Sequence, residues 1–247
     1  NWEKKLIIWI CNRFDYAHQP DAEKIGFPDQ EYYDLINDCK NRDNVHIIGY
    51  TPFENYYANT IRKLSIGNEI IKPIGEVSEV YKNYNSTKIE NKDETFFIGP
   101  YHNDNIMMNL KEKVESLGIK SYNGRYNGPL DLAEFAGVIH IPYAWSNLAL
   151  FEAIQLGIIY FIPSLNFLKE LKQNNNFWFQ DIYSFNNIRL SEWYCEDFKD
   201  ILVYFDSWED LKNKINNIIL KLQKQKIKKN GVEHKLLMLN KWEKCIN

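Results

Sequence analysis

The segment from residue 139 to residue 164 carries the residue types needed to bind a phosphorylated ligand. An apolar stretch gives way to a polar turn, and a helix is expected to begin near Ser146 or Asn147. The exposed N–H groups and the positive dipole end of such a helix favour a diphosphate. Glu152 follows about a turn and a half later, where its carboxylate can accept hydrogen bonds from ribose hydroxyls. Gly157 then lets the chain leave the helix tightly.

A framework of strands and helices must hold these residues, and the apolar pattern predicts one. Apolar runs alternate with segments of helical period, which is typical of a parallel sheet with crossover helices. We therefore expect an α/β fold made of Rossmann-like domains. Strands are expected at residues 6–11, 45–50, 69–72, 95–99, 121–122, 138–142, 158–163 and 201–205. Helices are expected at residues 29–36, after Thr51, and at residues 106–117, 130–135, 147–156, 167–173 and 208–229, with further helix in the tail.

A change of composition divides the chain into two parts. Residues 76–94 are rich in Asn, Lys, Ser and Glu and lack a sustained apolar period, which predicts a linker or mobile loop. We expect an N-terminal Rossmann-like domain at residues 1–75 and a C-terminal one at residues 95–229. The first is expected to be reduced or truncated, because only about three strands precede the linker. Residues 230–247 are expected to form a C-terminal helix that could pack back on the first domain.

Ligands bind open parallel sheets where strands end and loops lead into helices. The polar and aromatic residues that follow the expected strands are therefore candidates for a site. They are Arg13, Asp15, Lys72, Gly99, His102, Arg125, Tyr143, Trp145, Ser146 and Asn147.

Charge and cysteine content exclude several classes of protein. The formal net charge of -3 gives no sign of a polyanion-binding surface, so we do not expect nucleic acid as a partner. The four cysteines are far apart and predict neither a zinc site nor a disulfide framework, which favours a reducing, cytoplasmic setting. No apolar run approaches the roughly 20 residues needed to cross a bilayer. A basic run at residues 221–229 could touch an anionic membrane, although a solvated helix face also explains it.

Residues 139–164 resemble the donor-site signature of glycosyltransferases with the GT-B fold, especially the family-4-like group. There, a proline-ending strand, a small polar loop and a Glu-Ala helix precede a glycine and a hydrophobic strand ending near Pro-Ser. The resemblance is good over residues 95–164. It implies two Rossmann-like domains facing a cleft, with Glu152 on the nucleotide ribose and the surroundings of Ser146 and Asn147 on the diphosphate.

The resemblance also implies roles for residues at the other strand ends. The loop with Gly99 and His102 would lie near the phosphates, although a lone histidine can equally be a surface or capping residue. Arg125 falls where the base-contacting loop is expected, and Tyr126 or Tyr122 could stack on the base.

The remaining candidates belong to the chemistry of transfer. Asp15 could deprotonate an acceptor hydroxyl, and Arg13 or Lys72 could offset charge on the departing diphosphate. For each of these three, an ion pair that merely fixes the turn is the alternative.

One position departs from the signature. The family usually carries a second Glu eight positions before the ribose-binding one, and here that position is Ala144, between Tyr143 and Trp145. A retaining mechanism of the family-4 type is therefore in question.

The resemblance predicts transfer of a hexose from a nucleotide-diphosphate sugar, of UDP or GDP type, to a glycan or glycoprotein hydroxyl. We expect no cofactor and no essential metal, since no DxD spacing falls at a strand end. The segments at residues 9–15 and 49–53 look similar to glycosyltransferase modules of large DNA viruses. The chain could be part of a larger polypeptide. The alternatives are a sugar-nucleotide epimerase, a phosphorylase-like enzyme, or an inert glycan- or nucleotide-binding module.

Overall fold

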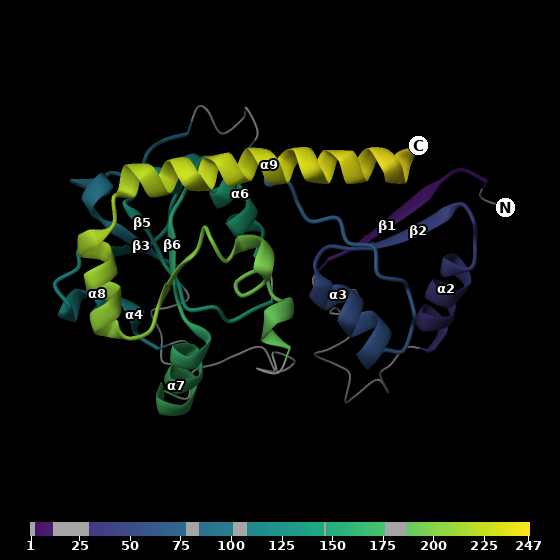
Figure 1. Cartoon of the computed structure of the whole chain (residues 1–247), viewed down its shortest axis with the longest axis horizontal. Coiled ribbons are helices and arrows are strands. Elements are labelled where there is room, and N and C mark those ends of the chain that lie inside the picture. Colours follow the sequence, from purple (N-terminus) through teal and green to yellow (C-terminus); the bar gives the residue numbers. More distant parts are fainter. Residues whose placement is uncertain (1–2, 12–29, 78–83, 101–107, 146, 176–186) are drawn as a thin grey trace. The chain divides into compact units, whose positions relative to one another are not determined.

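The computed structural model describes residues 3–11, 30–77, 84–100, 108–145, 147–175 and 187–247 (Figure 1). The chain divides into two compact units. Unit 1 consists of Asn1–Pro73 together with Leu236–Asn247, and unit 2 consists of Ile74–Lys235. Among the described residues, no helix is both long and apolar enough to cross a membrane.

Unit 1 is built on two parallel strands, β1 (Leu6–Ile10) and β2 (Val45–Gly49). Helix α2 (Gln30–Lys40) and helix α3 (Pro52–Tyr56), which continues as a π-helix, pack beside them. The cap predicted for α3 is confirmed, because the Thr51 hydroxyl accepts a hydrogen bond from the Phe53 N–H at 3.1 Å. The apolar cluster at the centre of unit 1 comprises Ile10, Tyr33, Ile36, Ile47, Ala58, Leu64 and Ile66.

The third strand predicted for unit 1, at residues 69–72, is wrong. Only a single parallel bridge joins Gly49 to Ile70. Side chains take the place of a further strand: Lys241 donates to the Ile70 carbonyl at 3.0 Å, and the Trp9 indole donates to the Ile71 carbonyl at 2.9 Å. Backbone pairing with β2 is thus limited to the hydrogen bonds of Gly49 with Glu69 and Ile71, and the segment does not form a regular strand.

Unit 2 contains a five-stranded, fully parallel sheet in the order β4-β3-β5-β6-β7. The strands are β3 (Phe96–Ile98), β4 (Ser121–Asn123), β5 (Gly137–Ile139), β6 (Tyr160–Pro163) and β7 (Val203–Phe205). The central strands β3, β5 and β6 are buried along their whole length, as expected when helices cover both faces of a parallel sheet. The prediction of an α/β, Rossmann-like fold is confirmed for this unit.

Helices connect the strands of unit 2, and their starts follow ordinary capping rules. Asn109, Asn147 and Ser207 each accept a hydrogen bond from the first turn of the helix that they precede. The helices are α4 (Leu110–Ser116), α5 (Pro129–Ala133), α6 (Leu148–Leu156), α7 (Leu165–Asn175) and α8 (Trp208–Asn217).

The prediction of one helix over residues 208–229 is wrong. Helix α8 ends where Ile218 takes up an extended backbone conformation, with φ -74° and ψ 133°. Helix α9 (Leu220–Ile246) then begins and continues through the tail. An apolar period persists across such a break, so the pattern alone could not reveal it. Residues of α9 up to Lys235 belong to unit 2, and those from Leu236 belong to unit 1.

Part of the segment expected to be a linker or mobile loop is attached to α5 by buried polar contacts. Thr87 donates to Asp131 through its N–H (2.9 Å) and its hydroxyl (2.5 Å). The Lys92 ammonium contacts the carboxylates of Asp131 and Glu134, the latter at 2.8 Å. Tyr84 donates to the other Glu134 oxygen. These contacts fix residues 84–92 within unit 2.

Candidate functional site

The strand order of unit 2 defines where a ligand is expected to bind. The chain passes from β3 to β4 on one side and then crosses back to β5 on the other side of β3. The strand order thus reverses between β3 and β5, and in open α/β sheets the carboxyl ends of the two strands at such a point are the usual ligand site. Gly99 follows β3, and its carbonyl accepts a hydrogen bond from the Asn123 amide at 3.0 Å. Residues 140–145 follow β5 as a loop.

The loop after β5 leads directly into the N-terminus of α6. Asn147 caps this helix, because its Oδ1 accepts a hydrogen bond from the Ala149 N–H at 3.0 Å. The predicted helix start is thus confirmed. Since the helix begins at the edge of the sheet where ligands bind, its positive dipole end faces the expected position of an anion. Ser146, the other residue assigned to the diphosphate, lies outside the described residues.

Glu152 lies in the middle of α6 and is half-buried. Burial raises the pKa of its carboxyl above the ordinary value. No residue in the described part of the chain forms a hydrogen bond or an ion pair with this carboxylate. Gln155, less than one turn further on, differs because it donates to the carbonyls of Ile74 and Gly231, each at 2.9 Å. Glu152 is therefore partly removed from water while its acceptor oxygens are still available to a ligand.

Close backbone contacts hold the Glu152 turn in place. Gly75 has a left-handed conformation (φ +74°) and lies against α6: a Cβ at residue 75 would be 2.2 Å from the Phe151 carbonyl carbon and 2.6 Å from the Glu152 nitrogen. The helix ends at Gly157, which is also left-handed (φ +74°), as the sequence predicted. A side chain at residue 75 would therefore displace the backbone that carries Glu152, whereas one at residue 157 would meet Lys228 and the Lys224 carbonyl of α9.

An aromatic cluster lies beneath the loop after β5. The His140 ring is 4.6 Å from that of Trp193 and 5.9 Å from that of Tyr143, between centroids. Tyr160, on β6, joins the cluster at 5.7 Å from Trp193. Burial, together with the nearby Tyr126, Glu152 and Tyr143, raises the pKa of Tyr160 well above its usual range, so its hydroxyl stays protonated.

The segment Ser191–Cys195 also contacts this loop, and the sequence reasoning missed it. The Trp193 indole donates to the Ala144 carbonyl at 3.1 Å, and the Glu192 N–H donates to the Trp145 carbonyl at 3.3 Å. Glu192 is itself buried, with 1% of its surface exposed. The available signal was the run of a carboxylate and two aromatic residues shortly before β7, since such residues are seldom placed in a connecting loop without a packing role.

The aromatic candidates are placed differently from one another. Trp145 is buried, with 3% of its surface exposed, so the loop presents its backbone carbonyl rather than its ring. Tyr143 is half-buried and meets the edge of His140. Tyr122 is half-buried on the edge strand β4 and stacks on Phe135 with ring centroids 5.8 Å apart.

The two basic candidates within the described residues belong to different units. Arg125 is exposed on the loop after β4, where its carbonyl accepts from the Tyr122 hydroxyl at 3.1 Å. Lys72 belongs to unit 1 and is buried, and its N–H donates to the Met238 sulfur at 3.2 Å. Arg13, Asp15 and His102 lie outside the described residues, so their predicted roles stay predictions.

Two further observations concern metal ligands and similarity to known proteins. Within the described ranges, no three or more His, Cys, Asp or Glu side chains are grouped so that they could hold a metal ion. Comparisons with protein-family models, with curated proteins and with solved structures found no match.

Proposed function

We propose that the chain is a glycosyltransferase that moves a hexose from a nucleotide-diphosphate sugar to a glycan hydroxyl. The donor would bind unit 2 at the divergence of β3 and β5. The observation that carries the proposal is Glu152, a half-buried carboxylate of raised pKa whose oxygens have no partner among the described residues. A pair of ribose hydroxyls supplies the two donors that such a group lacks.

The arrangement of α6 supports the same assignment. Glu152 lies roughly 7 Å along the axis from the helix start at Asn147. That separation fits a nucleotide diphosphate whose phosphates face the helix N-terminus and whose ribose lies beside Glu152, about a turn and a half further along the helix. The loop residues Gly99 and Tyr143 would border the phosphates and the sugar.

In the proposed reaction, an acceptor hydroxyl oxygen attacks the anomeric carbon of the donor. The bond from that carbon to the diphosphate oxygen breaks, and the nucleotide diphosphate leaves with the electron pair. Asp15 would take the hydroxyl proton, and Arg13 or Lys72 would offset the charge of the leaving group. Unit 1 would then be the acceptor-side domain of a GT-B arrangement. Because Ala144 carries no acid, the choice between retention and inversion rests on other residues.

Calorimetry with a panel of UDP-, GDP- and TDP-sugars tests the proposal. We expect one base class to bind, and Glu152→Ala to weaken its affinity by about 1–3 kcal/mol, the scale of a hydrogen bond to a charged group. Glu209→Gln removes an exposed carboxylate from α8 and should leave the affinity unchanged. Absence of binding by every nucleotide sugar would refute the proposal. Unchanged affinity in a folded Glu152→Ala variant would remove Glu152 as the ribose ligand.

A further inference from the structure

Exposed apolar side chains are concentrated on α9. Of the twelve large hydrophobic residues that are exposed in the described part of the chain, six lie on this helix. They are Leu222, Val232, Leu236, Leu237, Leu239 and Ile246. Isolated exposed leucines are ordinary, but such a concentration on one element marks an interaction surface.

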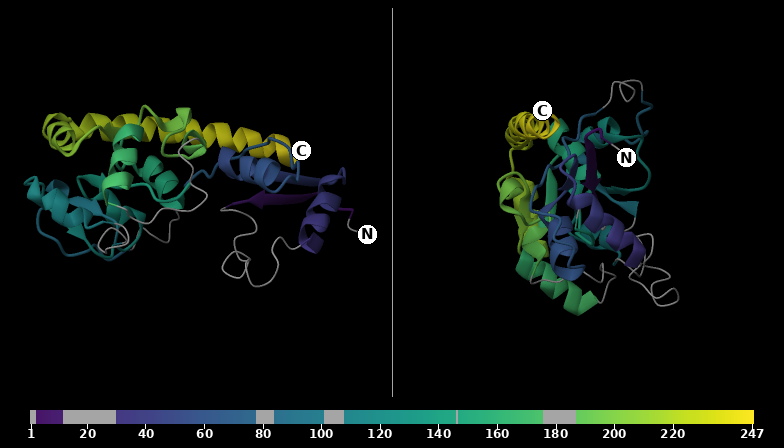
Figure 2. Two further views of the ribbon diagram at one scale, coloured as in Figure 1. Left: turned by 90° about the horizontal axis from the view of Figure 1, so that it is seen from below. Right: turned by 90° about the vertical axis from the view of Figure 1, so that its right-hand side faces the viewer.

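Three of these residues form a continuous stripe. Val232, Leu236 and Leu239 follow one another at spacings of four and three, so they share one face of the helix, and they are 58%, 58% and 44% exposed. The opposite face is buried through Ile227, His234, Met238 and Cys245. Helix α9 runs without interruption from Leu220 to Ile246 (Figures 1 and 2). A four-three repeat is the seam along which two helices pack.

Charged residues of opposite sign close the two ends of this stripe. Lys229 lies seven residues before Leu236, and Glu243 lies seven residues after it, so both share the face of the apolar centre. The Lys229 side chain is 81% exposed, and its ion pair with Glu233, at 4.0 Å, is a surface contact of little energy. The Lys229 ammonium can therefore exchange that contact for another carboxylate at small cost.

We propose that the α9 stripe is the self-association surface of this chain, on which two copies pair antiparallel and cross at Leu236. Antiparallel pairing places Lys229 of each copy beside Glu243 of the other, at both ends of the apolar centre. Parallel pairing would instead set lysine against lysine and glutamate against glutamate. The apolar residues supply the affinity, and the charges fix the orientation. Pairing in this way does not depend on donor binding.

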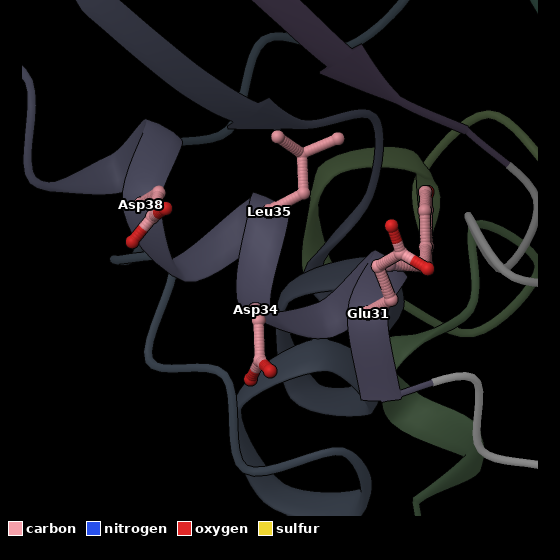
Figure 3. Close-up of a pocket in the computed structure, with 5 residues that line it drawn as sticks. Glu31, Asp34, Leu35 and Asp38 are labelled. Carbon is pink, nitrogen blue, oxygen red and sulfur yellow. The ribbon is translucent and has the colours of Figure 1, made fainter.

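Helix α2 offers a contrasting surface on which two copies would repel each other. A shallow hollow there is lined by Glu31, Tyr32, Asp34, Leu35 and Asp38 (Figure 3). Leu35 is 57% exposed, much like Leu236, but three carboxylates surround it. Leu35 therefore provides a matched control, because it is an equally exposed leucine whose surroundings oppose self-pairing.

Sedimentation velocity of the full chain, at concentrations from about 1 µM to about 100 µM, tests the pairing. We expect a monomer–dimer equilibrium that Leu236→Asp abolishes and Leu35→Asp leaves in place. Circular dichroism will establish that both variants keep their helix content. A wild-type chain that stays monomeric over the whole range overturns the proposal, as does a dimer that Leu35→Asp removes and Leu236→Asp does not.

Charge reversal then tests the orientation. Lys229→Glu or Glu243→Lys alone places like charges together at both ends of the dimer, so each should weaken dimerisation about tenfold or more. The double variant Lys229→Glu/Glu243→Lys restores opposite charges and should return the dissociation constant to within about threefold of the wild type. If the double variant stays as weak as either single one, antiparallel pairing at Leu236 is wrong.

Discussion

Replacing Asp131 with asparagine should destabilise the chain far more than the loss of an ordinary surface charge. Asp131 is fully buried and accepts hydrogen bonds from Thr87, from the Asn127 N–H at 2.7 Å and from Lys92. Burial alone would raise the pKa of its carboxyl, but these hydrogen bonds outweigh burial and lower the pKa from 3.8 to about 2.

The size of the effect follows from that pKa. Lowering it from 3.8 to about 2 corresponds to about 2 kcal/mol of stability at neutral pH. Asparagine also leaves the buried Lys92 ammonium with Glu134 as its remaining carboxylate, which adds to the loss. We therefore expect Asp131→Asn to cost about 3 kcal/mol in the free energy of unfolding.

Urea unfolding followed by circular dichroism measures this cost, and its pH dependence tests the cause. A lowered pKa means that the stabilisation is complete above pH 3.8 and is lost as the pH falls through about 2. The difference between wild type and Asp131→Asn should thus be constant at neutral pH and shrink below pH 4. Glu196→Gln, which removes an exposed partner of Lys199, should leave the free energy of unfolding almost unchanged. The reasoning would be refuted if the two variants lost the same free energy of unfolding. It would also be refuted if the difference between wild type and Asp131→Asn did not change as the pH is lowered.

Two further predictions concern the turn that carries Glu152. Because burial raises the pKa of Glu152, ionisation opposes folding above the ordinary glutamate range, so Glu152→Gln should raise the melting temperature at pH 7. That gain should fade as the pH is lowered below 4.5, where the wild-type carboxyl is neutral. Glu209→Gln removes an exposed carboxylate from α8 and should not raise the melting temperature at pH 7. Gly75→Ala should destabilise the chain by about 2–4 kcal/mol, because it adds a backbone clash at Phe151 to left-handed strain. Gly118→Ala has the same strain (φ +79°) with nothing within 4 Å, so it should cost only about 1 kcal/mol, and equal losses would show that the close approach at Gly75 is unimportant.

The sequence predicted the sheet of unit 2 well because burial on both faces leaves a clear pattern. Phe96–Ile98, Gly137–Ile139 and Tyr160–Pro163 are entirely buried, and each appears in the sequence as an uninterrupted apolar run. The caps at Thr51 and Asn147 were predictable for a similar reason, since capping depends only on neighbouring residues.

Features that depend on distant partners could not be predicted in the same way. Residues 84–92 look polar and unstructured until Asp131 and Glu134 are placed beside them, more than 40 positions along the chain. Trp145 was a candidate for donor binding because it follows an expected strand, yet its surroundings bury it. Glu192 contacts the loop after β5 through tertiary packing, which no local sequence pattern predicts.

The division of α9 between the units has a consequence for the order of folding during synthesis. Unit 2 is one continuous stretch, Ile74–Lys235, so all of its residues are available before the end of α9 emerges from the ribosome. Unit 1 must wait, because Lys5 bonds to the Ile246 carbonyl, 241 positions later, and Trp9 meets Trp242 edge-on. Contacts so far apart in sequence close slowly. Strand β1 therefore completes its packing only after α9 has been made, more than 200 positions later, and until then the Trp9 ring lacks its contact with Trp242.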